Sequence, residues 1–573
     1  MEITLRVSGA HRDSRPGRIE IRADEQSLTP FAGLAITGQL VPGLRLVPLL
    51  DAELAQVRRA APVKLRERGL SGGELLVSLA ECQLTGGECF SDVEQLRADL
   101  AGAPLRAVAD APSAATALQL AKRFRRSHVQ AAERAMARAG DALDRALGRD
   151  PAEPVTIDLD ATGIEVYGRR KRGARRSRHG SVSYAPHVAF WAERGRPLTS
   201  ELVPGNREKL SGRESARIAR RALSLLPEGH GEATLRVDSA YYALELLREL
   251  RAGGARFTVS LPRTTAMWRT LERIPDSAWQ EAEEMDGAEV AETGYRPEGW
   301  EHEELRLIVR RVRFTRAQLA STSSRRRRTI HPEQLQLCLD GKRGHAYGYS
   351  FILTDIPNAE RSARGVEHFH RHRAQIEERL KEAKLGQALR HLPSGCEHAN
   401  RVWLGAALLA LCLTAMTCDL CPEAGASGRA PQRAPLRRAA KTLRRLLFCV
   451  PARIIRSGRR LILRLPAGFR HAATFRATYE AAYALRPPEP ARREPRRSRA
   501  EPQPTAGCPR TAPNSANQPD PATPQGRAGN TASGSRHRQR LRPAKPPDQP
   551  LLTDLGLRWT PLSSARLGLV SFG

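Results

Sequence analysis

The sequence predicts an α/β protein whose core is interrupted by a β-rich insertion, with mostly helical N- and C-terminal regions and a disordered Pro/Arg-rich tail. Three observations support this fold class. Residues 151–262 alternate between strand-like and helical runs, which is typical of an α/β core. Residues 31–150 carry apolar residues at helical spacing instead. From Arg486 to Pro550 there is no apolar periodicity, so this stretch cannot bury enough surface to fold.

These patterns divide the chain into successive segments. They are an N-terminal segment (1–30), a helical domain that either grips DNA or serves for packing (31–150), the first part of the core (151–262), the β-rich insertion (263–348), the second part of the core (349–420), a basic helical C-terminal region (421–485), a disordered Pro/Arg-rich linker (486–550) and an unassigned end (551–573).

Local signals predict the individual elements. Ser113, which follows Pro112, marks the start of a helix in the N-terminal domain. Apolar and polar side chains alternate through residues 155–162, which predicts a strand. One face of that strand is acidic, because Asp158 and Asp160 are two residues apart.

A second strand, Ala233 to Val237, ends at Asp238 and is followed by a helix and a third strand, Arg256 to Leu261. Open α/β sheets bind ligands at the carboxyl ends of their strands, so Asp238 is a candidate site residue. After the insertion, the strand Tyr349 to Thr354 returns to the core, and Glu367 to Gly386 forms a helix.

The charge of the chain favours a nucleic acid partner. The 573 residues carry a formal net charge of +31, a positive field that a neutral small substrate would not require. The competing interpretation is a generally Arg-rich composition, since only 9 of the 93 basic residues are lysine. The Arg-rich stretch from Leu436 to Leu465 is read in the same two ways, as a solvated helix face or as a phosphate-gripping one.

Cysteine usage and hydropathy favour a reduced, cytoplasmic location without a membrane partner. The 9 cysteines are scattered, and the chain opens at Met1 without the features of a secretion signal. Cys418 and Cys421 lack a second pair at zinc-ligand spacing, so we read them as buried thiols. The apolar run Val402 to Cys418 is short for a membrane span and predicts a buried core helix.

A polar stripe is the most informative motif. His370, Arg373, Glu377 and Lys384 follow the spacing His-x2-Arg-x3-Glu-x6-Lys, and on a helix these offsets return to nearly the same face. A carboxylate between cations on one helical face is suited to binding a divalent ion beside a polyanionic substrate.

Together with Asp160 and Asp238, this stripe resembles the DDE transposases of bacterial insertion sequences, in the branch marked by Tyr-x2-Arg-x3-Glu-x6-Lys. His370 stands where that branch has Tyr. More narrowly, the chain resembles the insertion-sequence family numbered thirteen-eighty. The resemblance covers roughly residues 31–485 and rests on Ile157-Asp-Leu-Asp-Ala-Thr162, Val166-Tyr-Gly168, Leu235-Arg-Val-Asp-Ser-Ala-Tyr241, Gly254-Ala-Arg-Phe257, Arg373-Ala-Gln-Ile-Glu377, Pro393-Ser394 and Ala399-Asn400.

The resemblance implies an RNase-H-like core and a bacterial, nucleoid-associated protein. It also implies an enzyme that binds the terminal inverted repeats of its element, cuts at the ends and joins them to target DNA, as a homodimer on paired ends. Asp160, Asp238 and Glu377 would be the catalytic residues and would hold two Mg²⁺ ions, for which Mn²⁺ substitutes. His370, Arg373 and Lys384 would contact DNA phosphates.

Alternatives remain open from sequence. Asp158 shares a face with Asp160 and could be the first metal ligand, although the Asp-Ala-Thr pattern of residues 160–162 favours Asp160. The chain could also be a decayed remnant that binds DNA without cutting it, or a host nuclease on the same core.

Overall fold

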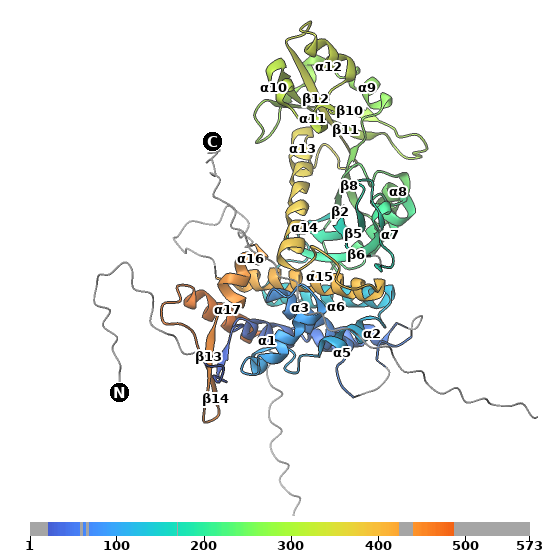
Figure 1. The fold of residues 1–573 in the computed structure, drawn as a ribbon. Helices are drawn as coiled ribbons and strands as arrows, with labels where there is room; N and C mark the ends of the chain where they lie inside the picture. Colours follow the sequence, from blue (N-terminus) through green and yellow to red (C-terminus); the bar gives the residue numbers. More distant parts are fainter. Residues whose placement is uncertain (1–20, 58–60, 65–67, 169, 423–438, 486–573) are drawn as a thin grey trace, which may run out of the picture. The chain divides into compact units, whose positions relative to one another are not determined.

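The computed structural model describes residues 21–57, 61–64, 68–168, 170–422 and 439–485 (Figure 1). All of these residues belong to one compact unit. The predicted linker (486–550) and the unassigned end (551–573) lie outside the described residues.

The N-terminal region is helical, as predicted. Its helices are α1 (Leu34–Gly43), α2 (Leu46–Ala55), α3 (Gly72–Leu84), α4 (Val93–Ala98), α5 (Ala114–Ala121) and α6 (Arg126–Ala146). The predicted start at Ser113 is confirmed, because its side chain accepts a hydrogen bond from the backbone N–H of Thr116 and caps α5.

Helix α15 (Glu397–Leu420) is the buried centre of this helical layer. The prediction of a buried core helix for residues 402–418 is confirmed. Within the described ranges, α15 is the single helix long and apolar enough to cross a membrane, and 83% of its most apolar 18-residue stretch is buried inside the protein. Its Trp403 packs against Phe90 with ring centroids 5.1 Å apart and donates a hydrogen bond to the Ala388 carbonyl.

The centre of the fold is a mixed sheet with the strand order β6-β5-β2-β7-β8 on one side. The strands predicted at 155–162, 233–237 and 256–261 are confirmed within one residue of their ends as β2 (Val155–Ala161), β7 (Ala233–Val237) and β8 (Arg256–Leu261), which run parallel.

An antiparallel hairpin that the sequence patterns did not predict lies beside these parallel strands. Its strands are β5 (Val182–Trp191), which is antiparallel to β2, and β6 (Arg196–Pro204), which is antiparallel to β5. The short strands β3 (Ile164–Glu165) and β4 (Arg175–Arg176) pair with β5 as well.

Helices cover both faces of this sheet. Apolar side chains of α7 (Gly212–Leu223) and α8 (Leu244–Ala252) share a core with β2, β7 and β8. On the other side lie α13 (Ala363–Arg371) and α14 (Gln375–Gly386), which follow one another beside the sheet in Figure 1. Covered on both faces, β2 buries Thr156 and Asp158 as well as its apolar residues. The predicted acidic face of this strand is therefore largely an interior one.

The stretch predicted as a β-rich insertion contributes strands that extend the same sheet. Strand β12 (His345–Thr354), which includes the predicted strand at 349–354, pairs with β8, and β11 (Leu305–Thr315), β10 (Ala288–Tyr295) and β9 (Gln280–Glu281) follow in order. Four helices accompany them, α9 (Thr265–Leu271), α10 (Arg316–Ser321), α11 (Ser324–Arg327) and α12 (Pro332–Leu339). Glu367 on α13 accepts a hydrogen bond from Arg310 on β11 at 2.6 Å, which ties this extension to the helix that precedes Glu377.

The helical prediction for the basic C-terminal region is wrong over residues 452–464. Helix α16 (Ala440–Leu443) and a π-helical turn (Arg444–Phe448) come first, and α17 (Ala472–Ala484) comes last. Between them, β13 (Ala452–Ser457) and β14 (Arg460–Arg464) form an antiparallel hairpin that pairs with β1 (Leu28–Thr29). Pro451 ends the helical path, and Gly458 adopts a φ of 60°, which favours a tight two-residue turn.

We expect Trp403→Ala to lower the free energy of unfolding by about 3–5 kcal/mol, because the fully buried ring would leave a cavity and an unpaired Ala388 carbonyl. Chemical denaturation measures the effect. Leu100→Ala is the control, because Leu100 is 79% exposed and its truncation should change stability by less than about 0.5 kcal/mol. Equal stability of the two variants would contradict this assignment of the core.

Candidate active site

Two of the predicted carboxylates lie side by side at one edge of the sheet. The parallel register of β2 and β7 pairs Leu159 with Val237, so the next residue along each strand is Asp160 and Asp238. The carboxyl ends of parallel strands meet at the same sheet edge. The Asp238 carboxylate also accepts a hydrogen bond from the Ala240 N–H at 2.9 Å, which orients it at the turn after β7.

Asp158 is committed to a buried ion pair. It is 2% exposed, and its two oxygens accept hydrogen bonds from Arg236 at 2.7 and 2.8 Å. Register places these residues directly opposite each other on β2 and β7. A carboxylate whose oxygens are both occupied by a guanidinium fork is poorly available to another ligand. This arrangement favours Asp160 over Asp158 as the strand-borne site residue.

The predicted helix from Glu367 to Gly386 is interrupted at the centre of the motif. Residues His372–Ala374 form a 3-10 turn between α13 and α14. A 3-10 turn has about 3.0 residues per turn instead of 3.6, so side chains on its two sides rotate relative to one another. The four motif residues therefore do not form one stripe in a common environment.

Arg373, within this 3-10 turn, lies between two of the carboxylates. Its Nη1 donates to Asp160 Oδ2 at 3.2 Å, and its Nη2 is 3.9 Å from Glu377 Oε1. The guanidinium thus connects the strand-borne carboxylate to the helix-borne one.

His370 is buried against β8. One ring nitrogen is hydrogen-bonded with the Thr258 hydroxyl at 2.9 Å and the other with the Ser260 hydroxyl at 2.8 Å. With both nitrogens occupied, the ring anchors α13 to the sheet and has no nitrogen left for the phosphate contact that the sequence predicted. Burial lowers the pKa of His370 to about 3, and the nearby Arg373 charge acts in the same direction, so the ring is neutral at pH 7.

Glu377 and Lys384 reach the same cavity as Asp160. This cavity has a volume of about 640 Å³ and is lined by these three residues together with Thr162, Lys381 and Arg390, among others. The Glu377 side chain is 65% exposed, so packing does not hold it in one rotamer. Burial lowers the pKa of Lys384, which lines the same cavity as Asp160 and Glu377.

The electrostatics of this edge set Asp160 apart. Burial raises the pKa of the Asp160 carboxyl, the Arg373 guanidinium opposes that rise, and the neighbouring Asp238 charge adds to it. A carboxylate whose pKa is raised by a second carboxylate is suited to binding a cation, since a positive charge relieves the repulsion between them.

Sequence reasoning assigned no role to two residues behind these aspartates. The Tyr241 hydroxyl is 2.6 Å from His187 Nδ1, and both side chains are buried. Burial raises the pKa of Tyr241 well above its usual value, and burial lowers the pKa of His187 to about 4. Tyr241 lies three residues after Asp238, which was a usable signal, whereas His187 reaches the site only through the pairing of β5 with β2.

The donor set fits a divalent ion in part. Carboxylate oxygens are the ligands that hard divalent cations prefer. In the portion of the chain that the structure describes, no three His, Cys, Asp or Glu side chains are close enough to hold one metal ion together. Asp160 and Asp238 form the fixed pair, and Glu377 shares the cavity with Asp160 but has its oxygen near Arg373.

Comparison with protein families decides the class of protein. The family model for "Transposase DDE domain group 1" matches residues 12–487, which is most of the chain. The chain belongs to this DDE transposase family. The resemblance inferred from the motifs is thus confirmed at the level of the family, while the narrower resemblance to family thirteen-eighty stays a prediction.

Among solved structures, this DDE transposase chain matches a cryo-EM structure described as a piggyBac transposase synaptic complex with hairpin DNA. The TM-score is 0.31 and the identity is 8%, over 73% of this chain and 79% of that chain. A likeness of this size carries no argument about the site. No curated protein matches the chain.

We expect Asp158→Asn to destabilise the protein by about 3–5 kcal/mol, because it leaves the Arg236 charge buried without its partner. Asp160→Asn should lower the free energy of unfolding by less than about 1 kcal/mol, since it removes a desolvated charge beside Asp238. Urea denaturation at pH 7 compares them. A larger loss for Asp160→Asn would reverse the assigned roles of the two aspartates.

The buried His370 should make stability sensitive to acid. Its pKa in the folded protein, about 3, lies below the ordinary value of 6.5. As pH falls through this interval, the unfolded chain takes up a proton that the folded chain does not, so stability is lost. Between pH 6 and 4, the free energy of unfolding of His370→Gln should fall by about 1.4 kcal/mol less per pH unit than that of the unmodified protein.

Denaturation midpoints measured at several pH values give this slope. His230→Gln, at an exposed position, is the control and should keep the slope of the unmodified protein. An unchanged slope in His370→Gln would show that His370 is accessible to protons in the folded state.

Proposed function

We propose that the chain is a DNA transposase that binds the terminal inverted repeats of its own insertion sequence and catalyses metal-dependent strand cleavage and strand transfer. The observation that carries this proposal is the position of Asp160 and Asp238, each directly after the paired residues Leu159 and Val237 of β2 and β7, with Glu377 lining the same cavity as Asp160. Membership of the DDE transposase family supports the reaction class.

Each site residue then has a separate task. Asp160 and Asp238 would hold divalent ions, Mg²⁺ or in its place Mn²⁺, and Glu377 would complete the set by a change of rotamer. Two bound ions supply a deprotonated water or hydroxyl on one side of the phosphorus and neutralise the leaving oxygen on the other. Arg373 would release Asp160 and bind a DNA phosphate in its place, so that its planar donor fork orients that phosphate. Lys384 would add a positive charge in the same cavity.

The finer assignments follow from the same residues. An RNase-H-like core is supported by the order β6-β5-β2-β7-β8 and by the placement of two carboxylates at its parallel centre. The motifs around Asp160, Asp238 and Glu377 support the narrower family thirteen-eighty. Cutting and joining must be coordinated at two element ends, so we propose a homodimer on paired ends.

The test uses a supercoiled plasmid that carries the ends of the element. With Mg²⁺ we expect nicking and strand transfer, and chelation by EDTA should stop both. Glu377→Gln should reduce cleavage by roughly 10³-fold or more while DNA binding persists, because a carboxylate of the reacting centre is lost. Glu378→Gln, an exposed neighbour on α14, is the matched control and should remain active. Unreduced cleavage by Glu377→Gln would rule out the assignment.

A second candidate is a remnant that binds DNA without cutting it. It is favoured by the ion pair between Arg373 and Asp160, which occupies an oxygen that a metal would need. Binding of the element ends with no cleavage in either Mg²⁺ or Mn²⁺ would select this function over the first.

A further inference from the structure

The hairpin formed by β13 and β14 is an exposed ribbon on the helical part of the protein. It pairs with the body through the two-residue strand β1, and among the described residues no strand pairs with the outer edge of β14. In Figure 1 the ribbon projects away from the neighbouring helices. Ser457 pairs with Arg460 across the turn Gly458-Arg459.

The hairpin is strongly basic and contains no acid. Residues 452–464 include five arginines and no Asp or Glu, and every one of the five is exposed. Arg453 is ion-paired with Glu25 at 3.0 Å. In the described part of the chain, the remaining four arginines (456, 459, 460 and 464) make no salt bridge to an acidic side chain.

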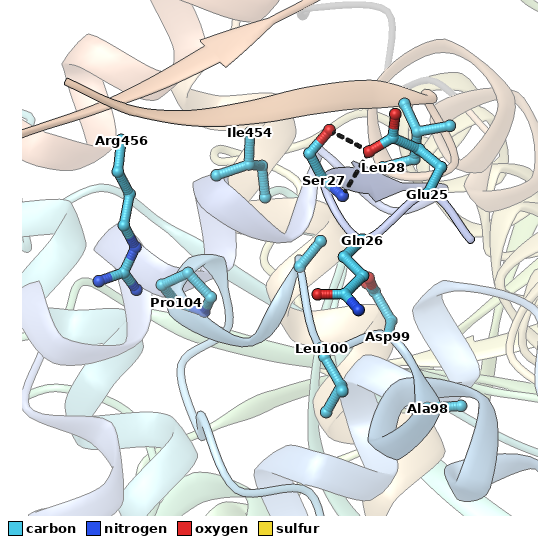
Figure 2. A pocket seen from close by; sticks show the side chains of 11 residues that line it. Glu25, Gln26, Ser27, Leu28, Ala98, Asp99, Leu100, Pro104, Ile454 and Arg456 are labelled. Carbon is cyan, nitrogen blue, oxygen red and sulfur yellow. Dashed lines mark hydrogen bonds between the residues drawn. The ribbon is translucent and has the colours of Figure 1, made fainter.

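The two faces of the hairpin differ in what they contact. Ile454 and Arg456 line a cavity with Leu28 and Pro104, and Figure 2 shows both side chains extending from β13 on the side of that cavity. Leu461 and Leu463 line a second cavity with residues of α1 and α17. This face is turned toward the protein body.

The opposite face carries Arg453, Arg460 and Arg464, because residues two apart on a strand point the same way and paired residues share a face. Arg453 stands directly across from Arg464. Like charges in this position repel and destabilise the ribbon. A bound anionic partner would attract both arginines and offset the repulsion between them.

We infer that this outer face binds duplex DNA, with Arg460, Arg464 and the turn residue Arg459 on backbone phosphates. The inference rests on the proposed function, which makes DNA the substrate. A two-stranded ribbon fits the major groove, which is about 12 Å wide. Arginine presents a planar donor fork that matches a phosphate. These contacts position the duplex and require no particular sequence.

The experiment measures binding of the full chain to a fluorescent duplex that carries the element end, over a series of salt concentrations. The hairpin variant is Arg460→Ala with Arg464→Ala. We expect roughly ten- to a hundred-fold weaker binding at about 0.1 M salt, and a slope of log K against log salt that is smaller by about 2. A random duplex of equal length should show the same loss, because phosphates carry no sequence information.

The matched control is Arg213→Ala with Arg217→Ala on α7. These arginines are also exposed, and in the described residues neither makes a salt bridge. The control should keep the salt slope of the unmodified protein. An equal loss in both variants, or no loss in the hairpin variant, would overturn the inference.

A charge-conserving variant and a lipid-binding assay test the nature of the contact. Arg460→Lys with Arg464→Lys keeps the charges and should keep most of the salt slope, so a loss of slope in this variant as well would count against phosphate contact. If the alanine variant binds DNA normally but no longer binds vesicles of anionic lipid, the ribbon is a membrane contact and the inference is wrong. Loss of duplex binding in the hairpin variant reports on the ribbon, whereas loss of plasmid cleavage in Glu377→Gln reports on the catalytic residues, so the two proposals fail separately.

Discussion

The candidate site depends on the register between β2 and β7. Both strands are parallel, and their alignment brings Asp160 and Asp238 to the same edge at the same height. The buried pair between Asp158 and Arg236 holds this register, because a slip of one residue would send the two side chains to opposite faces and leave both charges buried alone. Arg236 also donates to the Phe369 carbonyl at 2.7 Å, so the same guanidinium holds α13 against the sheet.

A second set of contacts fixes α13, the helix that precedes Glu377, against the same sheet. His370 fastens α13 to two hydroxyls of β8, and Glu367 fastens it to Arg310 on β11. The 3-10 turn then changes the direction of the side chains before α14 begins. As a result, Arg373 faces Asp160, whereas Glu377 remains exposed with freedom to rearrange. The hydrogen-bonded carboxylates at the strand ends and the exposed one on the helix therefore differ in how much they must reorganise when a ligand binds.

Much of this arrangement could be predicted from the sequence, and the failures have identifiable causes. Strand periodicity located β2, β7 and β8, and the position of Asp238 at a strand end followed directly. The choice between Asp158 and Asp160 was open because residues two apart on a strand share a face, and only the register with Arg236 separates them. The burial of His370 was hidden because its partners, Thr258 and Ser260, lie more than a hundred positions away. The hairpin was mistaken for a helix because its apolar and Arg residues satisfy helical spacing as well as strand alternation, although Pro451 and Gly458 favour the strand through backbone geometry.

A formal charge of +31 does not by itself mean a uniformly positive surface, since many arginines are neutralised inside the protein. Arg196 is bound to Asp144 and Asp419, Arg236 to Asp158 and Arg310 to Glu367, and each of these pairs is largely removed from water. Such arginines contribute to packing and register, and their field is cancelled at short range. The arginines that can attract a polyanion are those without a carboxylate partner. In the described residues, the β13–β14 hairpin gathers four of these within one short ribbon, so charge placement, more than net charge, supports the proposed DNA contact.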